Sequence, residues 1–282
     1  MERRKTNKLV QPVLKWAGGK RQLLPEIRKS LPNPKSYNRY FEPFLGGGAV
    51  LFDLQPKKAV VNDFNTEAIN VYQIIKDDVN GLIEHLKTHK NESEYFYNIR
   101  ELDRNVGFGE MPALVRASRI IYLNKTCYNG LFRVNSQGQF NVPFGRYKNP
   151  NIVNDVVLRA VSRYLNDNKV EILNTDFEKS LNSIKKNDFV YFDPPYDPVS
   201  DSSSFTGYTL NGFDKSEQER LKKLCDRLND KGCKFLASNS ATPFILDLYK
   251  NYQIVVVGAT RSINSNASGR GKIDEVLIKN YE

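Results

Sequence analysis

Residues 39–63 read RYFEPFLGGGAVLFDLQPKKAVVND, a stretch in which apolar runs alternate with turn signals. The pattern predicts a short strand over Arg39–Pro43, a helix over Ala49–Gln55 and a second strand over Lys58–Asn62. Glycines at 46–48 separate the first strand from the helix. Strands that alternate with helices at this spacing predict a parallel sheet with right-handed crossovers, so the expected fold class is α/β.

The same stretch predicts a nucleoside site. Glycine lacks the Cβ that would block a ligand, so Gly46 and Gly48 suit a close approach of the backbone to a bound molecule. Asp63 follows the second strand, where a doubly wound sheet places an acid that accepts hydrogen bonds from ribose hydroxyls. A triple glycine alone is usually only a turn, and it is the acid at the strand end that favours a ligand.

The α/β pattern returns in the second half of the chain. Five further strands are predicted, at Val170–Leu173, Phe189–Asp193, Cys233–Ser238, Gln253–Val257 and Ile273–Ile278. A polar loop between Tyr196 and Phe213 has the length of a functional lid.

The middle of the chain has a different character. Residues 67–127 show helical periodicity. Leu131–Val134 and Phe140–Pro143 then flank the turn signal Ser136-Gln137-Gly138, as the two arms of a β-hairpin would. We therefore expect a catalytic domain made of residues 1–66 and 155–282, and a helical domain with a hairpin inserted over residues 67–154.

The sequence Asp193-Pro194-Pro195-Tyr196 ends the apolar strand that precedes it. Two prolines fix the chain, so the Asp193 carboxylate and the Pro194 carbonyl are held rigidly as acceptors. Two fixed acceptors suit an exocyclic amino group with two hydrogens, and Tyr196 offers a flat surface on which an extruded base stacks. The plainer interpretation, a rigid turn at a strand end, stays open on this motif alone.

The charge of the chain is unevenly distributed. The formal net charge is +10, from 42 basic and 32 acidic residues. Residues 1–41 contain eleven Lys or Arg and two acids, and residues 111–154 contain six Lys or Arg and no acid. Two separate basic stretches favour a face that binds a polyanion, although composition by itself also fits simple solubility.

Several other chemistries lack their residues. Three cysteines without a CxxC pair favour reduced thiols over a disulfide framework: Cys127, Cys225 and Cys233. His85 and His89 are four residues apart on a predicted helix, but without HExxH they favour a solvated face, and no metal is expected. No apolar run is long enough for a membrane span. A cytoplasmic protein is expected.

Beyond these local patterns, six motifs occur in an order that resembles a known family. They are residues 15–20 (KWAGGK), 41–48 (FEPFLGGG), 62–63 (ND), 128–133 (YNGLFR), 140–147 (FNVPFGRY) and 193–196 (DPPY). The chain resembles the Dam-type, α-class DNA adenine-N6 methyltransferases, above all the GATC-specific modification enzymes of restriction–modification systems. The resemblance implies a Rossmann-like sheet of seven strands with an antiparallel last strand.

The resemblance also implies roles for the matching positions. S-adenosylmethionine would be bound by Trp16, Lys20, Phe44, Gly46, Gly48, Asp63, Asp176, Phe177 and Asp193. The target adenine would be held by Asp193, Pro194 and Tyr196.

For the DNA, the resemblance implies a hairpin that enters the duplex. The expected contacts are Lys15, Asn129, Leu131, Arg133, Pro143, Arg146 and Tyr147. Arg133 and Lys15 would read guanines, Leu131 and Pro143 a thymine methyl, and Asn129 would fill the gap left by a flipped base.

The sequence thus predicts transfer of a methyl group to adenine N6 in double-stranded DNA, within GATC. A cognate restriction endonuclease is an expected member of the same system, without a stable complex. Three alternatives stay open: an RNA adenine methyltransferase, a cytosine-N4 methyltransferase, in which Ser usually replaces Asp193, and a non-catalytic DNA-binding protein on the same scaffold.

Overall fold

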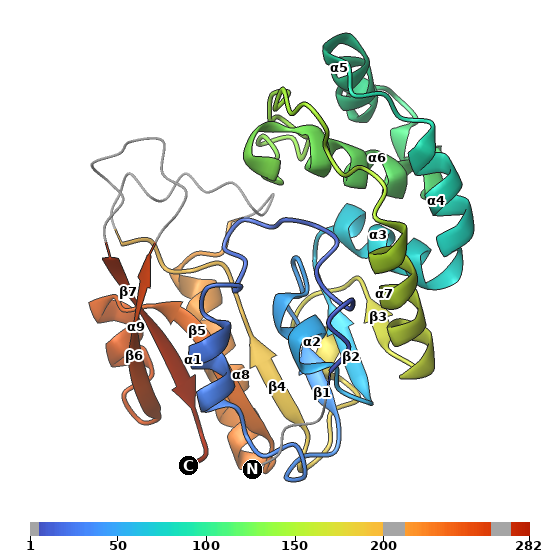
Figure 1. The fold of residues 1–282 in the computed structure, drawn as a ribbon. Helices are drawn as coiled ribbons and strands as arrows, with labels where there is room; N and C mark the ends of the chain where they lie inside the picture. The colour runs from blue at the N-terminus through green and yellow to red at the C-terminus, as the bar shows by residue number, and fades with distance from the viewer. Residues whose placement is uncertain (1–5, 200–211, 261–271) are drawn as a thin grey trace.

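The computed structural model describes residues 6–199, 212–260 and 272–282 (Figure 1). The basic tail Arg3–Lys5 and most of the polar loop predicted between Tyr196 and Phe213 lie outside these residues.

Seven strands form one sheet in the order β3-β2-β1-β4-β5-β7-β6 (Figure 1). They are β1 (Tyr40–Glu42), β2 (Ala59–Asn62), β3 (Glu171–Leu173), β4 (Phe189–Phe192), β5 (Lys234–Ser240), β6 (Gln253–Thr260) and β7 (Lys272–Lys279). β7 is antiparallel to both of its neighbours, and the pairs from β3 to β5 are parallel. The seven predicted strands are confirmed, and so is the mixed, Rossmann-like α/β sheet.

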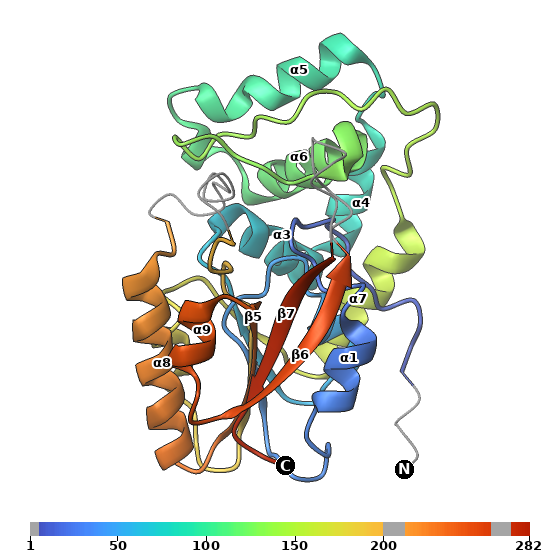
Figure 2. The same cartoon turned by 90° about the vertical axis from the view of Figure 1, so that its left-hand side faces the viewer.

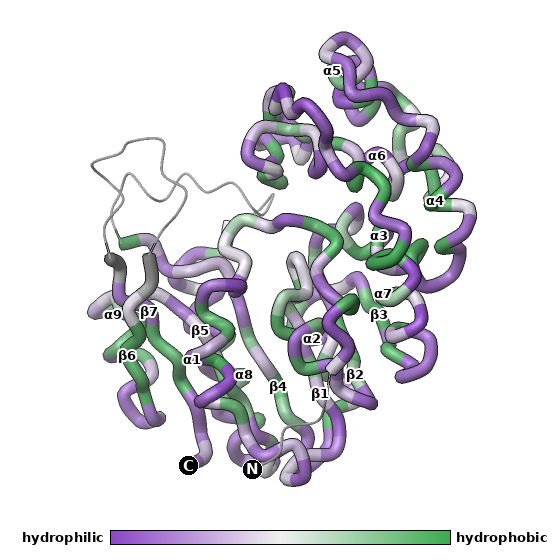
Figure 3. The backbone as a smooth tube through the Cα atoms, viewed as in Figure 1, coloured by the Kyte–Doolittle hydropathy of each residue, from purple (hydrophilic) through white to green (hydrophobic). Residues whose placement is uncertain are grey.

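Both faces of the sheet are buried at its central strands. In β4, Phe189 and Tyr191 belong to one hydrophobic core, and Val190 and Phe192 belong to the other. A strand covered on both sides reads as a continuous apolar run, and Figure 3 shows such hydrophobic stretches along the strands. Asp193 is therefore the first residue at which β4 leaves the core.

Helices supply the two cores. α8 (Lys215–Asp230) and α9 (Pro243–Leu248) lie on one face of the sheet, and α1 (Leu24–Ser30) lies on the other (Figure 2). The core on the α1 side also contains side chains of α2 (Ala49–Leu54) and α7 (Asp155–Asp167).

The chain between β2 and β3 is mainly helical, and residues 79–150 of it stand beyond one end of the sheet (Figure 1). It contains α3 (Thr66–Asp77), α4 (Val79–Lys87), α5 (Ser93–Glu101) and α6 (Ala113–Thr126), with 3₁₀ turns at Leu102–Arg104, Phe108–Glu110 and Tyr128–Gly130; a fourth such turn, Lys179–Leu181, precedes β4. α6 packs against α3, α4 and α5 and is almost entirely buried. The helical character predicted for residues 67–127 is confirmed.

The two predicted hairpin arms run antiparallel but do not form a continuous ladder. Val134 pairs with Phe140 and Cys127 with Phe144, each as an isolated bridge. The main chain of Asn135 accepts from Gly138 and donates to Gln139, which closes the predicted turn. The segment is thus a loop with the course of a hairpin.

The prediction of a solvated face at His85 and His89 is wrong. Both rings lie within hydrogen-bond distance of the Ser118 hydroxyl of α6, at 2.9 and 3.0 Å. The ring of His89 also stacks on Tyr122 with 4.4 Å between centroids. Burial, with the nearby His85, lowers the pKa of His89 to about 4, so this ring is neutral at physiological pH. Helical spacing alone does not show which face of α4 meets α6.

Within the three described ranges, no helix is long and apolar enough to cross a lipid bilayer. The three cysteines are free and buried.

Candidate active site

The predicted site residues meet where β1, β2 and β4 end. β1 and β2 run parallel, with Glu42 opposite Val61, so the glycine loop after β1 lies beside Asp63 after β2. Gly46 and Gly48 have φ of +48° and +69°, which other residues adopt at a cost. A Cβ on Gly46 would come within 2.9 Å of the Trp16 ring. The loop therefore needs glycine both for its conformation and for its contact with Trp16.

Asp63 fastens the glycine loop to the end of β2. Its Oδ2 accepts a hydrogen bond from the Gly46 N–H at 2.7 Å, and its Oδ1 accepts from the Asn65 N–H at 2.9 Å. Burial raises the pKa of Asp63, and these two N–H donors oppose that rise. Each carboxylate oxygen keeps a further lone pair, so the side chain has acceptor capacity left for ligand hydroxyls.

Asp193 follows β4 and is held through one of its oxygens. Lys20 Nζ lies 2.7 Å from Oδ1, and the Ser238 hydroxyl donates to the same oxygen at 3.0 Å. Among the residues that the structure describes, none donates to Oδ2, and none donates to the carbonyl of Pro194. Burial raises the pKa of Asp193, while Lys20 and Ser238 lower it in part. Two neighbouring acceptors thus have no donor among the described residues.

The main chain after Asp193 is fixed by buried amides. Gln218 of α8 donates to the Pro195 carbonyl at 2.9 Å, and Asn239 of β5 donates to Gln218 at 3.0 Å. Asn239 Oδ1 accepts from the Asp197 N–H at 3.0 Å. Because Gln218 and Asn239 are almost fully buried, the turn has little freedom to move.

Tyr196 is held at both ends. Its hydroxyl donates to Glu275 Oε2 at 3.0 Å, and Lys20 Nζ lies over its ring, 4.4 Å from the centroid. Since the cation covers one face of the ring, a base can stack only on the other face. Lys20 thus contacts two residues of the same motif.

A buried acid lies beneath the site. Glu42, in β1, is 2% exposed and accepts a hydrogen bond from the Tyr40 hydroxyl at 2.7 Å. Burial raises its pKa to about 8, the Tyr40 hydrogen bond opposes this, and the charge of Asp193 adds to it. Glu42 is therefore mostly protonated at neutral pH.

An aromatic cluster adjoins the glycine loop. Phe44 stacks on Phe177 with 5.3 Å between centroids, and Phe213 meets Phe44 edge-on at 5.7 Å. Arg220 lies over Phe177 at 4.4 Å and forms an ion pair with Asp176. Burial alone would raise the pKa of Asp176, but the hydrogen bond and charge of Arg220 outweigh it and hold that pKa below its usual value.

The predicted DNA-contacting residues lie on one segment and on the N-terminal motif that packs against it. Lys15 Nζ donates to the carbonyl of Asn129, which has a left-handed φ of 57°. Arg133 donates to Asn141 Oδ1 at 2.8 Å and is exposed. Four others follow: Leu131 is half-buried, and Pro143, Arg146 and Tyr147 are exposed. Within the described residues, Arg133 forms no ion pair.

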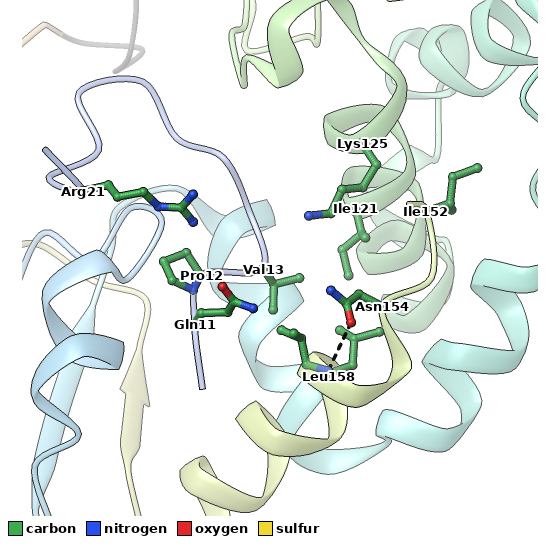
Figure 4. Close-up of a pocket in the computed structure, with 10 residues that line it drawn as sticks. Gln11, Pro12, Val13, Arg21, Ile121, Lys125, Ile152, Asn154 and Leu158 are labelled. Atoms are coloured by element: carbon green, nitrogen blue, oxygen red, sulfur yellow. Dashed lines mark hydrogen bonds between the residues drawn. The ribbon is translucent and has the colours of Figure 1, made fainter. Parts of the chain in front are cut away.

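A small pocket lies between the N-terminal segment, α6 and α7. Figure 4 shows Arg21 and Lys125 on opposite sides of it, with their charged ends toward the space between them. Neither forms an ion pair with a described residue. Burial, and the charge of Arg21, lower the pKa of Lys125. At about 150 Å³ the pocket is smaller than the ~300–1,000 Å³ usual for small-molecule sites.

Several residues of the site were not predicted. Ser238, Gln218 and Asn239 contact the motif from β5 and α8, and Asn124 of α6 contacts residues 15 and 130. One indication of the role of Asn124 was present in the sequence, because this polar residue directly follows the apolar run IIYL at 120–123.

Two comparisons with known proteins bear on this site. A family model described as D12 class N6 adenine-specific DNA methyltransferase matches residues 16–263. The match covers the N-terminal motif from Trp16 onward, the glycine loop, the loop with the course of a hairpin and the Asp193 motif.

Similar whole proteins exist in bacteria and archaea. The chain is 47% identical to the Type II methyltransferase M1.LlaDCHI of Lactococcus lactis subsp. cremoris over 96% of each chain. It is 42% identical to the Type II methyltransferase M.MjaIII of Methanocaldococcus jannaschii, over 96% of this chain and 99% of that one. It is 35% identical to a DNA adenine methylase of Haemophilus influenzae, over 95% of this chain and 92% of that one.

Proposed function

The chain belongs to the D12 class of N6 adenine-specific DNA methyltransferases, and on that premise we propose that it moves a methyl group from S-adenosylmethionine to an adenine flipped out of double-stranded DNA, within GATC. The family predicted from the six motifs is confirmed, and with it the enzymatic nature of the chain. An adenine-specific family also sets the cytosine-N4 alternative aside.

One observation carries the proposal. Asp193 Oδ2 and the Pro194 carbonyl oxygen lie next to each other in the chain, and neither has a donor among the described residues. An exocyclic amino group brings two hydrogens and needs two acceptors. The Asp193 side chain is 20% exposed, so its second oxygen is open to a ligand that supplies a donor.

The residues present also fit S-adenosylmethionine. The Asp63 carboxylate keeps lone pairs for the ribose hydroxyls, and Gly46 and Gly48 bring the main chain close. Trp16 and Phe44 border this loop with apolar surface, while Lys20, Asp176 and Phe177 complete the proposed set. When bound, S-adenosylmethionine supplies an electrophilic methyl group on a sulfonium.

The chain's own groups prepare the nucleophile. Hydrogen bonds from the adenine amino group to Asp193 and Pro194 reduce the overlap of the nitrogen lone pair with the ring and aim it. Lys20 keeps Asp193 in position and covers one face of Tyr196, so the base stacks on the opposite face. Orientation supplies most of the acceleration, and no metal or covalent enzyme intermediate is needed.

We assign the reading of DNA to residues 67–154, as an inserted recognition domain. Arg133 is exposed, carries no ion pair within the described residues and suits a guanine edge, for which arginine is the bidentate match. The other proposed contacts are Lys15, Asn129, Leu131, Pro143, Arg146 and Tyr147. The Arg21–Lys125 pocket has the size and charge for a DNA phosphate.

The names of the bacterial and archaeal relatives support a role in restriction–modification. A GATC-cutting endonuclease encoded beside the gene would support protection of host DNA as that role. The cytoplasmic location remains a prediction.

The proposal is tested by methyl transfer from labelled S-adenosylmethionine to matched duplexes that contain GATC, GTTC or GATG. N6-methyladenine in the GATC duplex alone is the expected product. Methylation of all three duplexes would contradict the sequence specificity and keep the chemistry. Binding of S-adenosylmethionine without transfer to any duplex would point to RNA instead.

A further inference from the structure

We propose that Asn124 is a positioning residue that couples the two ligand sites, so that binding of S-adenosylmethionine and binding of duplex DNA strengthen each other. The inference depends on the proposed function, because it needs both ligands. It goes beyond that function by assigning a role to a residue that touches neither of them.

The first observation is the hydrogen bonding of Asn124. This side chain is 1% exposed and lies in the last turn of α6. Its Oδ1 accepts from the Lys15 N–H at 2.8 Å, and its Nδ2 donates to the Lys15 carbonyl at 2.9 Å. The second Nδ2 hydrogen goes to the Gly130 carbonyl at 2.9 Å. One buried amide thus joins the N-terminal motif to the turn that carries Asn129.

The second observation is how tightly that turn packs on the N-terminal motif. A Cβ on Gly130 would lie 3.2 Å from the Asn124 carbonyl and 3.2 Å from Lys15 Cδ. Gly130 also has a φ of +62°. Lys15 Nζ donates to the Asn129 carbonyl. The turn therefore cannot shift without moving Lys15.

The third observation carries the connection to the cofactor side. The Trp16 indole stacks on Phe132, with 4.5 Å between centroids and 14° between planes. Trp16 also contacts the glycine loop, since a Cβ on Gly46 would lie 2.9 Å from its ring. Phe132 is 3% exposed and precedes Arg133. A continuous series of contacts runs from the glycine loop through Trp16 and Phe132 to the residue proposed to read guanine.

Because these contacts join the two proposed sites, either ligand would restrict the motion of the same segment, residues 15–20. A ligand that fixes residues 15–20 leaves less freedom to be lost when the second ligand binds the turn, which is positive coupling. Coupling between binding sites is reciprocal, so each ligand must raise the affinity for the other by the same factor. Asn124 contributes three of the hydrogen bonds that hold the two segments together.

The test measures the dissociation constant of labelled S-adenosylmethionine by equilibrium dialysis, with and without a GATC duplex. In the wild-type chain the duplex should lower that constant by about 5- to 150-fold, the usual range of allosteric coupling. Asn124→Ala should bring the ratio close to one. Phe132→Leu should reduce it as well, and this second variant keeps the Asn124 hydrogen bonds.

Asn280→Ala is the matched control. Asn280 also accepts one main-chain hydrogen bond, from Phe235 at 2.9 Å, and donates two, to Cys233 and Asn229 at 2.9 and 3.1 Å. Asn280 follows the last residue of β7 and lies beside the start of β5, whereas Ser238 lies toward the other end of β5. Its loss should lower the melting temperature while the coupling ratio stays at the wild-type value.

Trp16 supplies a second readout, because it is the one tryptophan in the chain. Addition of the duplex should shift its emission in the wild-type and Asn280→Ala chains and leave it unchanged in Asn124→Ala.

A wild-type coupling ratio in Asn124→Ala would overturn the inference. So would a wild-type chain that binds S-adenosylmethionine equally well with and without DNA, and this result would leave the proposed function intact. A wild-type chain that does not bind S-adenosylmethionine at all would overturn both.

Discussion

The Asp193 motif and the recognition segment, residues 124–147, are held in place by different means. The Asp193 motif continues a central strand and is fixed by buried side chains from β5 and α8. The recognition segment has only isolated bridges, and Asn129 and Arg146 in it have left-handed φ angles. The residues proposed for the chemistry thus lie on a rigid sheet, and those proposed to read DNA lie on a loop without a continuous ladder.

This contrast indicates what each region must do. In the proposed reaction, the amino group of the target has to meet two acceptors at fixed places, and small displacements there are costly. If the recognition segment contacts the duplex as proposed, it has to follow a groove that changes shape as a base leaves it, which suits a loop. Variants of the Asp193 motif should therefore leave DNA binding largely intact, and variants of the exposed proposed base contacts should leave methyl transfer largely intact. Asn124 and Phe132 are the exceptions, because their contacts join the two regions.

The largest effect is expected for Asp193→Ala. The variant removes both carboxylate oxygens, including the one that has no donor among the described residues, so methyl transfer should fall by about 100- to 1,000-fold, by analogy with the loss of one preorganised transition-state donor. Affinity for the GATC duplex should stay within a few-fold, because the recognition segment is untouched. Single-turnover rates and gel-shift titrations measure the two properties. Full activity in this variant would remove Asp193 from the mechanism.

Arg133→Ala should act on the other region. Loss of a bidentate guanine contact costs about 1–3 kcal/mol of discrimination at that base pair. The ratio of transfer to GATC over a duplex with that guanine replaced should fall accordingly, while the maximal rate at saturating DNA stays close to wild type. If the ratio is unchanged, another residue reads that guanine.

Lys125→Ala should have a smaller effect that does not depend on sequence. If the Arg21–Lys125 pocket holds a phosphate, affinity should fall equally for GATC and GATG duplexes. The slope of log affinity against log salt should become shallower by roughly one unit. Lys250→Ala is a suitable control, because Lys250 is an exposed lysine already paired with Asp247. An unchanged salt slope in Lys125→Ala would exclude the phosphate contact.

Glu42→Gln should affect stability and its pH dependence. The Glu42 carboxyl has a pKa of about 8 in the fold and of 4.5 in the unfolded chain. Its contribution to the free energy of unfolding is therefore complete below pH 4.5 and is lost as the pH rises toward 8. The free energy of unfolding of the wild-type chain should therefore decline over this window more steeply than that of Glu42→Gln. Urea titrations at pH 5 and pH 8 compare the two; parallel pH profiles would mean that Glu42 is ionised in the fold.

The sheet and the site residues at the ends of its strands could be predicted from the sequence, because they depend on local patterns. A strand buried on both faces is continuously apolar, so β4 and the position of Asp193 are apparent from residues 189–193 alone. The glycine loop and Asp63 carry their own turn and strand-end signals. These features need no knowledge of distant residues.

The residues that fix the site were not predictable in the same way. Ser238, Gln218 and Asn124 act through contacts with segments more than twenty residues away in the chain. Their roles depend on which elements become neighbours in the fold. The incorrect prediction for His85 and His89 has the same cause, since it was α6 that buried the face of α4.

The strand order has a consequence for how such a protein can be encoded. The half that carries the glycine loop and the half that carries Asp193 meet side by side at β1 and β4, although they are far apart in the chain. Near the C-terminus, the Tyr281 hydroxyl donates to the carbonyl of Ser30, the last residue of α1, at 2.8 Å, so β7 and α1 lie close together. A gene rearranged to join β7 through a linker to the segment before α1, and to open the chain between the halves, should assemble the same centre with its motifs in reverse order, as circular permutants of other folds do.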